Sequence, residues 1–242
     1  MDNKTTNNNF NTLAPSHSGR VGVGLKICGM KYPDNILEVS QLLPDFLGFI
    51  FYEKSSRFFD GEIPEIPKSI KKVGVFVDAA YDDVLLQIVK YNLHLVQLHG
   101  SESPEFCLNL KKENIEIIKV FSVDDDFDFD ILEKYEQVCD YFLFDTKGKL
   151  HGGNGTTFNW QILEKYKSDK PLFLSGGIGI EEIEKIKNLN LPIYAIDINS
   201  KFEIEPGLKN IELLKNINSV QTGCDLPLSP INNYKNDSNL SR

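Results

Sequence analysis

The sequence predicts a single closed barrel of eight parallel strands with intervening helices, a (β/α)8 barrel, on three observations. Eight short apolar runs recur at intervals of about 21 to 30 residues. The runs are rich in β-branched and aromatic residues and are mostly continuous rather than alternating, which is typical of parallel strands covered on both faces. Segments with helical periodicity lie between most of them, and each interval is long enough for one right-handed crossover.

Each apolar run is interpreted as one strand of the barrel. The expected strands are Leu25–Cys28, Phe46–Phe51, Val73–Val77, Leu95–Leu98, Ile117–Phe121, Tyr141–Phe144, Leu172–Leu174 and Ile193–Ile196. An open, doubly wound sheet built from the same units is the alternative architecture.

The predicted helices begin at acidic residues that precede an apolar stripe. Asp34, Asp82 and Glu181 each lie at the start of such a segment, where a negative charge complements the helix dipole. Pro64 and Pro67 leave little room for a regular helix in the second connection. That connection is therefore expected to be irregular.

Composition sets the domain organisation and excludes several classes of protein. The chain has 242 residues, of which 41% are hydrophobic, and this is enough for a substantial core. Polar, Asn-rich ends predict disordered tails at residues 1–22 and 217–242 around one folded unit at 23–216. The formal net charge of -9 argues against a nucleic-acid partner.

The cysteines and the apolar segments indicate a cytoplasmic protein. The four cysteines lie far apart without a C-x-x-C pair, so neither a disulfide framework nor a metal site is expected. No apolar run approaches the length of a membrane span, and the first residues contain no signal-like apolar region. We therefore expect no membrane association.

In a (β/α)8 barrel, function lies at the carboxyl ends of the strands and in the loops that follow them. The polar residues at these positions are Lys26, Cys28, Arg57, Asp78, Gln97, His99, Asp145, Ser175, Asp197 and Asn199.

Glycine-rich segments follow three of the last strands. They are Gly152–Gly155, Ser175–Gly179 and the Asn199–Ser200 pair after the eighth strand. Glycines let backbone N–H groups approach an anion, and loops after strands seven and eight hold a phosphate in many barrels. Each glycine segment alone could equally be a turn. Together they predict a site for a small phosphorylated substrate.

Four of the polar residues are candidates for chemistry or recognition, each with a structural alternative. Cys28 could be a nucleophile, a general base or a small buried apolar residue. Asp145 could act as an acid or cap the loop after its strand. His99 could be a satisfied polar residue at the rim. Arg57 could clamp a substrate carboxylate or be a solvated cation.

Six segments in order resemble the phosphoribosylanthranilate isomerase family of tryptophan biosynthesis. They are Lys26–Gly29, Gly48–Phe51 through Arg57, Val96–Gly100, Phe144–Asp145 followed by Gly152–Gly155 and Phe158–Trp160, Leu174–Gly177, and Asp197–Ser200 followed by Glu203 and Pro206–Lys209. The resemblance covers about residues 24 to 216. It implies a TIM barrel that performs an Amadori rearrangement without a cofactor.

The resemblance also implies a role for each site residue. Asp145 would be the general acid that protonates the furanose ring oxygen, and Cys28 the general base that removes the C2 proton from the other side of the barrel mouth. Arg57 would pair with the anthranilate carboxylate, and His99 would line the aromatic end. Backbone N–H groups would hold the phosphate around Gly155, Gly176, Gly177, Asn199 and Ser200. The chain is expected to be a monomer or a homodimer.

This sequence departs from the family pattern at Ser56, Asn154, Asn159 and Lys201. The departures bear on phosphate affinity rather than on the reaction. Two competing functions are the related histidine-pathway sugar isomerase, which uses two aspartates, and a binding barrel without turnover. Cys28 argues against the first, and the joint presence of Cys28 and Asp145 argues against the second.

Overall fold

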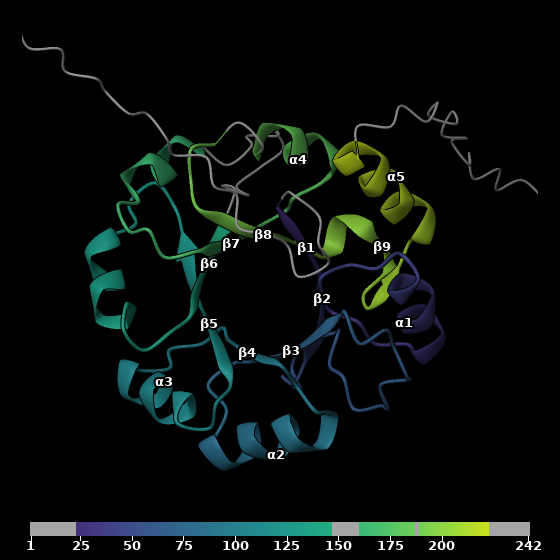
Figure 1. Cartoon of the computed structure of the whole chain (residues 1–242), viewed down its shortest axis with the longest axis horizontal. Helices are drawn as coiled ribbons and strands as arrows, with labels where there is room; N and C mark the ends of the chain where they lie inside the picture. Colours follow the sequence, from purple (N-terminus) through teal and green to yellow (C-terminus); the bar gives the residue numbers. More distant parts are fainter. Residues whose placement is uncertain (1–22, 147–159, 187–188, 223–242) are drawn as a thin grey trace, which may run out of the picture.

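The computed structural model describes residues 23–146, 160–186 and 189–222, and it contains a closed barrel of eight parallel strands. Neighbouring strands pair in sequence order, and β1 pairs with β8 to close the ring (Figure 1). The strands are β1 (Gly24–Ile27), β2 (Phe46–Ile50), β3 (Lys71–Phe76), β4 (Leu95–Leu98), β5 (Glu116–Val123), β6 (Tyr141–Thr146), β7 (Leu172–Ser175) and β8 (Ile193–Ile198). The predicted fold class is confirmed, and the open-sheet alternative is excluded.

Helical segments surround the barrel (Figure 1). They are α1 (Pro33–Ser40), α2 (Tyr81–Tyr91), α3 (Pro104–Lys111), η1 (Phe129–Tyr135), η2 (Trp160–Lys165), α4 (Ile180–Ile186), η3 (Ser200–Phe202) and α5 (Ile211–Thr222), the η segments being 3₁₀ helices. As the prolines predict, no helix lies between β2 and β3. Within the described ranges, no helix is both long and apolar enough to cross a bilayer.

Two features near the C-terminus differ from the sequence-based expectation. A short hairpin of β9 (Glu203–Glu205) and β10 (Leu208–Lys209) follows β8, and Gly207 supplies the positive φ of 91° that its turn requires. Helix α5 continues past the expected boundary at residue 216, and Ile217 is fully buried. The last helix therefore takes up the first residues of the segment expected to be a tail.

The barrel interior is filled by side chains that alternate along each strand. An apolar cluster inside the ring takes members from β2 through β8: Phe46, Val73, Leu95, Ile118, Val120, Leu143, Phe173 and Ala195. Gln97, Asp145 and Asp197 follow members of this cluster by two positions on β4, β6 and β8, so they also point inward. A polar layer thus lies directly above an apolar one, at the carboxyl end of the barrel.

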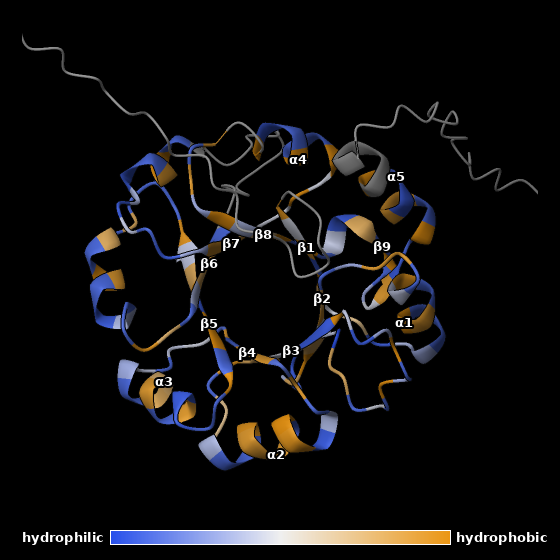
Figure 2. Cartoon of the chain, viewed as in Figure 1, coloured by the Kyte–Doolittle hydropathy of each residue, from blue (hydrophilic) through white to orange (hydrophobic). Residues whose placement is uncertain are grey.

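The larger apolar cluster lies between the strands and the surrounding helices. It includes Ile36 and Val39 of α1 and Leu214 and Ile217 of α5, which bury the apolar sides of these helices. Figure 2 shows the resulting mixture of hydrophilic and hydrophobic residues on the outer helices. This cluster attaches the helices to the outer face of the barrel, whose carboxyl ends carry the site.

Candidate active site

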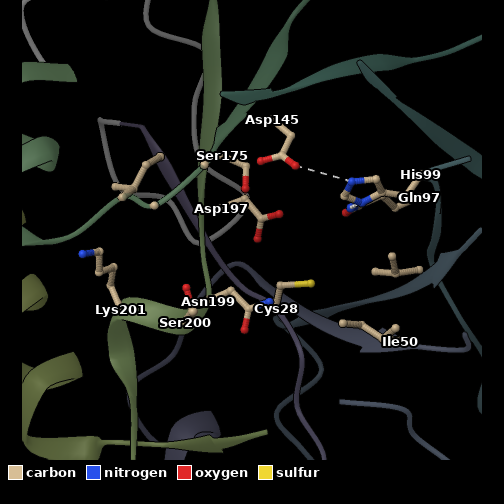
Figure 3. A pocket seen from close by; sticks show the side chains of 14 residues that line it. Cys28, Ile50, Gln97, His99, Asp145, Ser175, Asp197, Asn199, Ser200 and Lys201 are labelled. Carbon is tan, nitrogen blue, oxygen red and sulfur yellow. Dashed lines mark hydrogen bonds and ion pairs between the residues drawn. The ribbon is translucent and has the colours of Figure 1, made fainter. Parts of the chain in front are cut away.

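A pocket of about 210 Å³ opens at the carboxyl ends of the strands. Its lining residues are Cys28, Ile50, Val75, Gln97, His99, Asp145, Ser175, Gly176, Gly177, Ile178, Asp197, Asn199, Ser200 and Lys201 (Figure 3). Its position agrees with the rule that barrel enzymes carry their chemistry at this face.

Most of the site residues expected from the sequence lie around this one pocket. Those brought together are Cys28, His99, Asp145, Gly176, Gly177, Asn199 and Ser200. Arg57 does not line it, and Gly155 lies outside the described residues. The strands that carry Cys28 and Asp145, β1 and β6, are separated by β7 and β8 along one side of the ring, so the two groups are not diametrically opposed.

Cys28 directly follows β1 and continues its pairing, because its N–H donates to the carbonyl of Ile198 at 2.9 Å. Its thiol occupies space that a side chain on β2 would otherwise fill. A Cβ atom added to Gly48 would lie 2.8 Å from the Cys28 Sγ atom. Gly48 is therefore the residue that makes room for the thiol.

Burial raises the pKa of the Cys28 thiol above its usual value of 9.0. The positive charges of Lys26 and Lys209 oppose this shift and lower the pKa of the thiol. A thiolate formed here would be stabilised by both cations, although burial keeps the thiol the main form at neutral pH.

Lys26 and Asp197 form an ion pair beneath the pocket. They are register partners on β1 and β8, and Lys26 Nζ donates to Asp197 Oδ2 at 2.8 Å. Their side chains are 0% and 5% exposed. The pair therefore cancels two charges inside the barrel.

Replacing Lys26 by Met is expected to lower the free energy of unfolding by about 3–5 kcal/mol, because the Asp197 carboxylate would lose its buried partner. Urea denaturation of the full chain measures this loss. Lys71→Met is the matched control, since the Lys71 to Glu116 pair has a similar distance of 3.0 Å but side chains 18% and 40% exposed. Its expected cost is about 1 kcal/mol or less. Equal losses in the two variants would contradict the prediction.

Asp145, at the carboxyl end of β6, faces His99 across the pocket mouth. His99 Nε2 lies 3.6 Å from Asp145 Oδ2, which is too long for a hydrogen bond but close enough for attraction if the imidazole is charged (Figure 3). On the other side of the His99 imidazole, Gln97 Nε2 lies 3.4 Å from His99 Nδ1. Donation by Gln97 would place the imidazole proton on Nε2, pointing toward Asp145.

Arg57 binds a carboxylate of the protein itself. Its Nε and Nη2 atoms donate to Glu203 at 2.6 to 3.0 Å. Lys209 Nζ donates to the same carboxylate at 2.7 Å and to Asn199 Oδ1 at 2.7 Å. These two cations hold the pKa of Glu203 below its usual range in spite of burial. With two cations against one anion, this Arg57 cluster (Arg57, Lys209 and Glu203) carries a net positive charge.

Glycines shape two of the loops around the site. Gly29 has φ of 75°, and a Cβ atom there would lie 2.7 Å from Arg57 Cδ and 2.9 Å from Asn199 Oδ1. Gly176 and Gly177 have φ of 107° and 63°, which side chains rarely adopt, and a Cβ atom on Gly177 would meet nothing within 4 Å. The loop after β7 therefore turns sharply, and no side chain or backbone crowds it at Gly177.

Sequence reasoning identified the strand-end residues but did not give roles to those beneath them. Gln97 and Asp197 were recognised only as polar residues at strand ends, and Lys209 only within a family motif. The spacing of two residues from Lys26 to Cys28, from Gln97 to His99 and from Asp197 to Asn199 was an available signal. It places each pair on the same inward face of its strand.

Comparison with known proteins gives one consistent match. The family model described as N-(5'phosphoribosyl)anthranilate (PRA) isomerase matches residues 25–220. A relative of that name from Parabacteroides distasonis is 47% identical over 199 residues, covering 79% of this chain and 90% of the relative. A second, from Phocaeicola vulgatus, is 41% identical over 187 residues, covering 77% and 91%.

Solved structures of the same family have the same fold. The phosphoribosyl anthranilate isomerase of Thermotoga maritima is 30% identical, with a TM-score of 0.70, over 84% of this chain and all of that one. Another phosphoribosyl anthranilate isomerase structure, 28% identical with a TM-score of 0.70 and the same coverage, is a complex with reduced 1-(o-carboxyphenylamino)-1-deoxyribulose 5-phosphate.

Proposed function

The chain belongs to the phosphoribosylanthranilate isomerase family of tryptophan biosynthesis, and on that basis we propose that Asp145 and Cys28 are the general acid and general base of its reaction. The substrate is N-(5-phosphoribosyl)anthranilate, and the product is 1-(2-carboxyphenylamino)-1-deoxyribulose 5-phosphate. The observation that carries this assignment is that both groups border one pocket at the carboxyl ends of the strands. A ring held between them would be within reach of both.

The proposed reaction has two proton transfers on the protein. Asp145 donates a proton to the furanose ring oxygen as the bond from that oxygen to C1 breaks, which leaves a Schiff base between C1 and the anthranilate nitrogen. Cys28, as thiolate, then removes the proton from C2, and the electron pair moves to form an enolamine. Tautomerisation of the enolamine gives the ketone at C2 and completes the isomerisation. The ammonium groups near Cys28 support this role because they stabilise the thiolate.

The anthranilate carboxylate would bind at the Arg57 cluster. Because this cluster keeps one net positive charge after pairing with Glu203, it can attract a second carboxylate. Arg57 is already held by Glu203 before substrate binds, so its side chain loses less conformational entropy on binding. His99 would contact the aromatic ring from β4.

The phosphate would bind at the loops after β7 and β8. Support comes from the open space beside Gly177 and from Asn199 and Ser200, which line the same pocket. Lys201, which also lines the pocket, would add a positive charge where the family usually has glycine. Gly155 is proposed as a further contact by resemblance alone.

The direct test is a fluorescence assay that follows the loss of phosphoribosylanthranilate with the purified full chain. Turnover without any added cofactor is the expected result. A wild-type protein that binds the reduced product analogue but does not turn over substrate would support the binding-barrel alternative and overturn the proposal.

The pH dependence of Cys28 alkylation is expected to follow the raised pKa of its thiol. Below that pKa, each unit of pH increases the thiolate fraction about tenfold, so the rate of alkylation should rise through neutral pH and level off only above the usual thiol value of 9.0. Reaction of the full chain with iodoacetamide at a series of pH values, followed by mass spectrometry, measures this rate. A rate that levels off well below pH 9 would contradict this prediction.

We further propose a cytoplasmic enzyme with its folded unit between the two polar ends and with one or two subunits. One solved structure, 26% identical, is described as generated monomers of the dimeric enzyme of Thermotoga maritima, so both states occur for that protein. Sedimentation of the full chain would assign the state.

A further inference from the structure

The pocket floor contains a buried carboxylate oxygen without a donor. Asp197 is 5% exposed, and its Oδ2 atom accepts the hydrogen bond from Lys26. Its Oδ1 atom is buried and has no hydrogen-bond partner among the described residues. Figure 3 shows the Asp197 carboxylate among the side chains that line the pocket. An unsatisfied buried acceptor is costly, so an oxygen in this position favours a ligand that brings a donor.

The pocket floor has a second buried oxygen without a partner among the described residues, Gln97 Oε1. Its position depends on how the amide is assigned, because amide oxygen and nitrogen exchange places when the group is turned over. A carboxylate has two oxygens, so its orientation does not affect the conclusion.

The ammonium group of Lys26 favours the charged form of Asp197, in which both carboxylate oxygens accept hydrogen bonds. Burial raises the pKa of the Asp197 carboxyl, and the ammonium group of Lys26 opposes that shift by contact at 2.8 Å. The register pairing of β1 with β8 also fixes the position of the carboxylate, since Lys26 is itself fully enclosed. The pair is thus a rigid acceptor aimed at the site.

Asp197 lies between the proposed acid and base. It is close enough to influence Cys28, and Asp145 in turn influences it. Figure 3 shows its carboxylate between these two side chains. In the proposed reaction, Asp145 acts at the ring oxygen and Cys28 at the C2 proton. The substrate donor attached to the carbon where Cys28 acts is the C2 hydroxyl.

We propose that Asp197 Oδ1 accepts a hydrogen bond from the C2 hydroxyl of the phosphoribosyl group and so turns the C2 hydrogen toward Cys28. This assignment rests on the proposed function and adds to it a residue that binds the sugar. It predicts that the protein distinguishes ligands by this hydroxyl and that the distinction depends on Asp197.

The test compares two ligands on variant proteins by titration calorimetry of the full chain. The first ligand is the reduced product analogue, and the second is its counterpart without the C2 hydroxyl. In the wild type, loss of the hydroxyl is expected to weaken binding about 10- to 100-fold, as for a hydrogen bond to a charged group. In the Lys26→Met/Asp197→Leu variant, loss of the C2 hydroxyl should weaken binding by less than about threefold.

The double variant is chosen because it removes both buried charges together, which is tolerated far better than removal of one. Lys26→Met/Asp197→Asn keeps a carbonyl acceptor without the charge and should recover part of the discrimination. If the Leu variant does not fold, the Asn variant and the wild-type ratio still decide the question.

The matched control is Lys119→Met/Glu102→Gln. This second buried pair has a distance of 3.0 Å and side chains 3% and 2% exposed, but neither residue lines the pocket. It should keep the wild-type ratio between the two ligands, although binding of both can weaken. A ratio that falls equally in this control would overturn the proposal, because the effect would then come from lost stability.

A wild-type ratio near one would also overturn it. Failure of the proposed function gives a different result, since the wild type would then not turn over phosphoribosylanthranilate. Turnover with a ratio near one would refute only the role of Asp197.

Discussion

Asp145→Asn is expected to lower kcat by about 10²–10⁴-fold while binding of the reduced product analogue changes by less than about threefold. The amide has nearly the shape of the carboxyl group but cannot donate its proton to the ring oxygen. Ring opening would then depend on water. Steady-state kinetics and calorimetry on the same preparation measure the two quantities.

Asp140→Asn is the matched control for this variant. Asp140 lies just before β6, the strand that carries Asp145, and its carboxylate accepts from the N–H of Ile117 at 2.8 Å, away from the pocket. Its kcat is expected to stay within about twofold of the wild type, since it touches no reacting group. A similar kcat in both variants, close to that of the wild type, would show that Asp145 is not the acid.

Cys28→Ser is expected to lower kcat/KM by about 10²–10⁴-fold, because a serine hydroxyl has a far higher pKa than a thiol and cannot act as the base. The change is small in volume, and the serine side chain fits the space that Gly48 leaves for the thiol. Loss of structure is therefore not the expected cause, and thermal unfolding of the variant checks this.

Cys139→Ser provides the comparison, because Cys139 is 1% exposed and lies outside the pocket. Like Cys28→Ser, this variant replaces a buried thiol by a hydroxyl group. We expect its kcat/KM to remain close to the wild-type value even where its thermal stability falls. Retained activity in Cys28→Ser would remove Cys28 from the mechanism and leave the base to be sought elsewhere.

The fold was predictable because each strand carries its own local pattern. Buried parallel strands must be apolar, and eight such runs with room for crossovers leave few architectures. The hairpin of β9 and β10 was missed, although Pro206 and Gly207 are a strong turn signal. The extent of α5 was also missed, because its polar Asn and Ser residues hide the buried positions Leu214 and Ile217.

The site was predictable only where residues lie at strand ends. The contact between Arg57 and Glu203 joins residues 146 positions apart, and no local pattern indicates it. The roles proposed for Cys28 and Asp145 came from the resemblance, since each alone had an equally good structural explanation. Lys26 and Asp197 were noted only as polar residues at strand ends. Inward alternation along the strands would have placed them beneath Cys28 and Asn199, which they precede by two residues.

The ion pair of Lys26 and Asp197 also has a consequence for synthesis of the protein on the ribosome. Its members are 171 positions apart, in the first and last strands of the barrel. A nascent chain that has not yet released β8 cannot neutralise Lys26, and its sheet keeps two unpaired edges. Prematurely terminated chains therefore lack both the pairing of β1 with β8 and the Asp197 carboxylate. Translation must pass residue 197 before any product can be active.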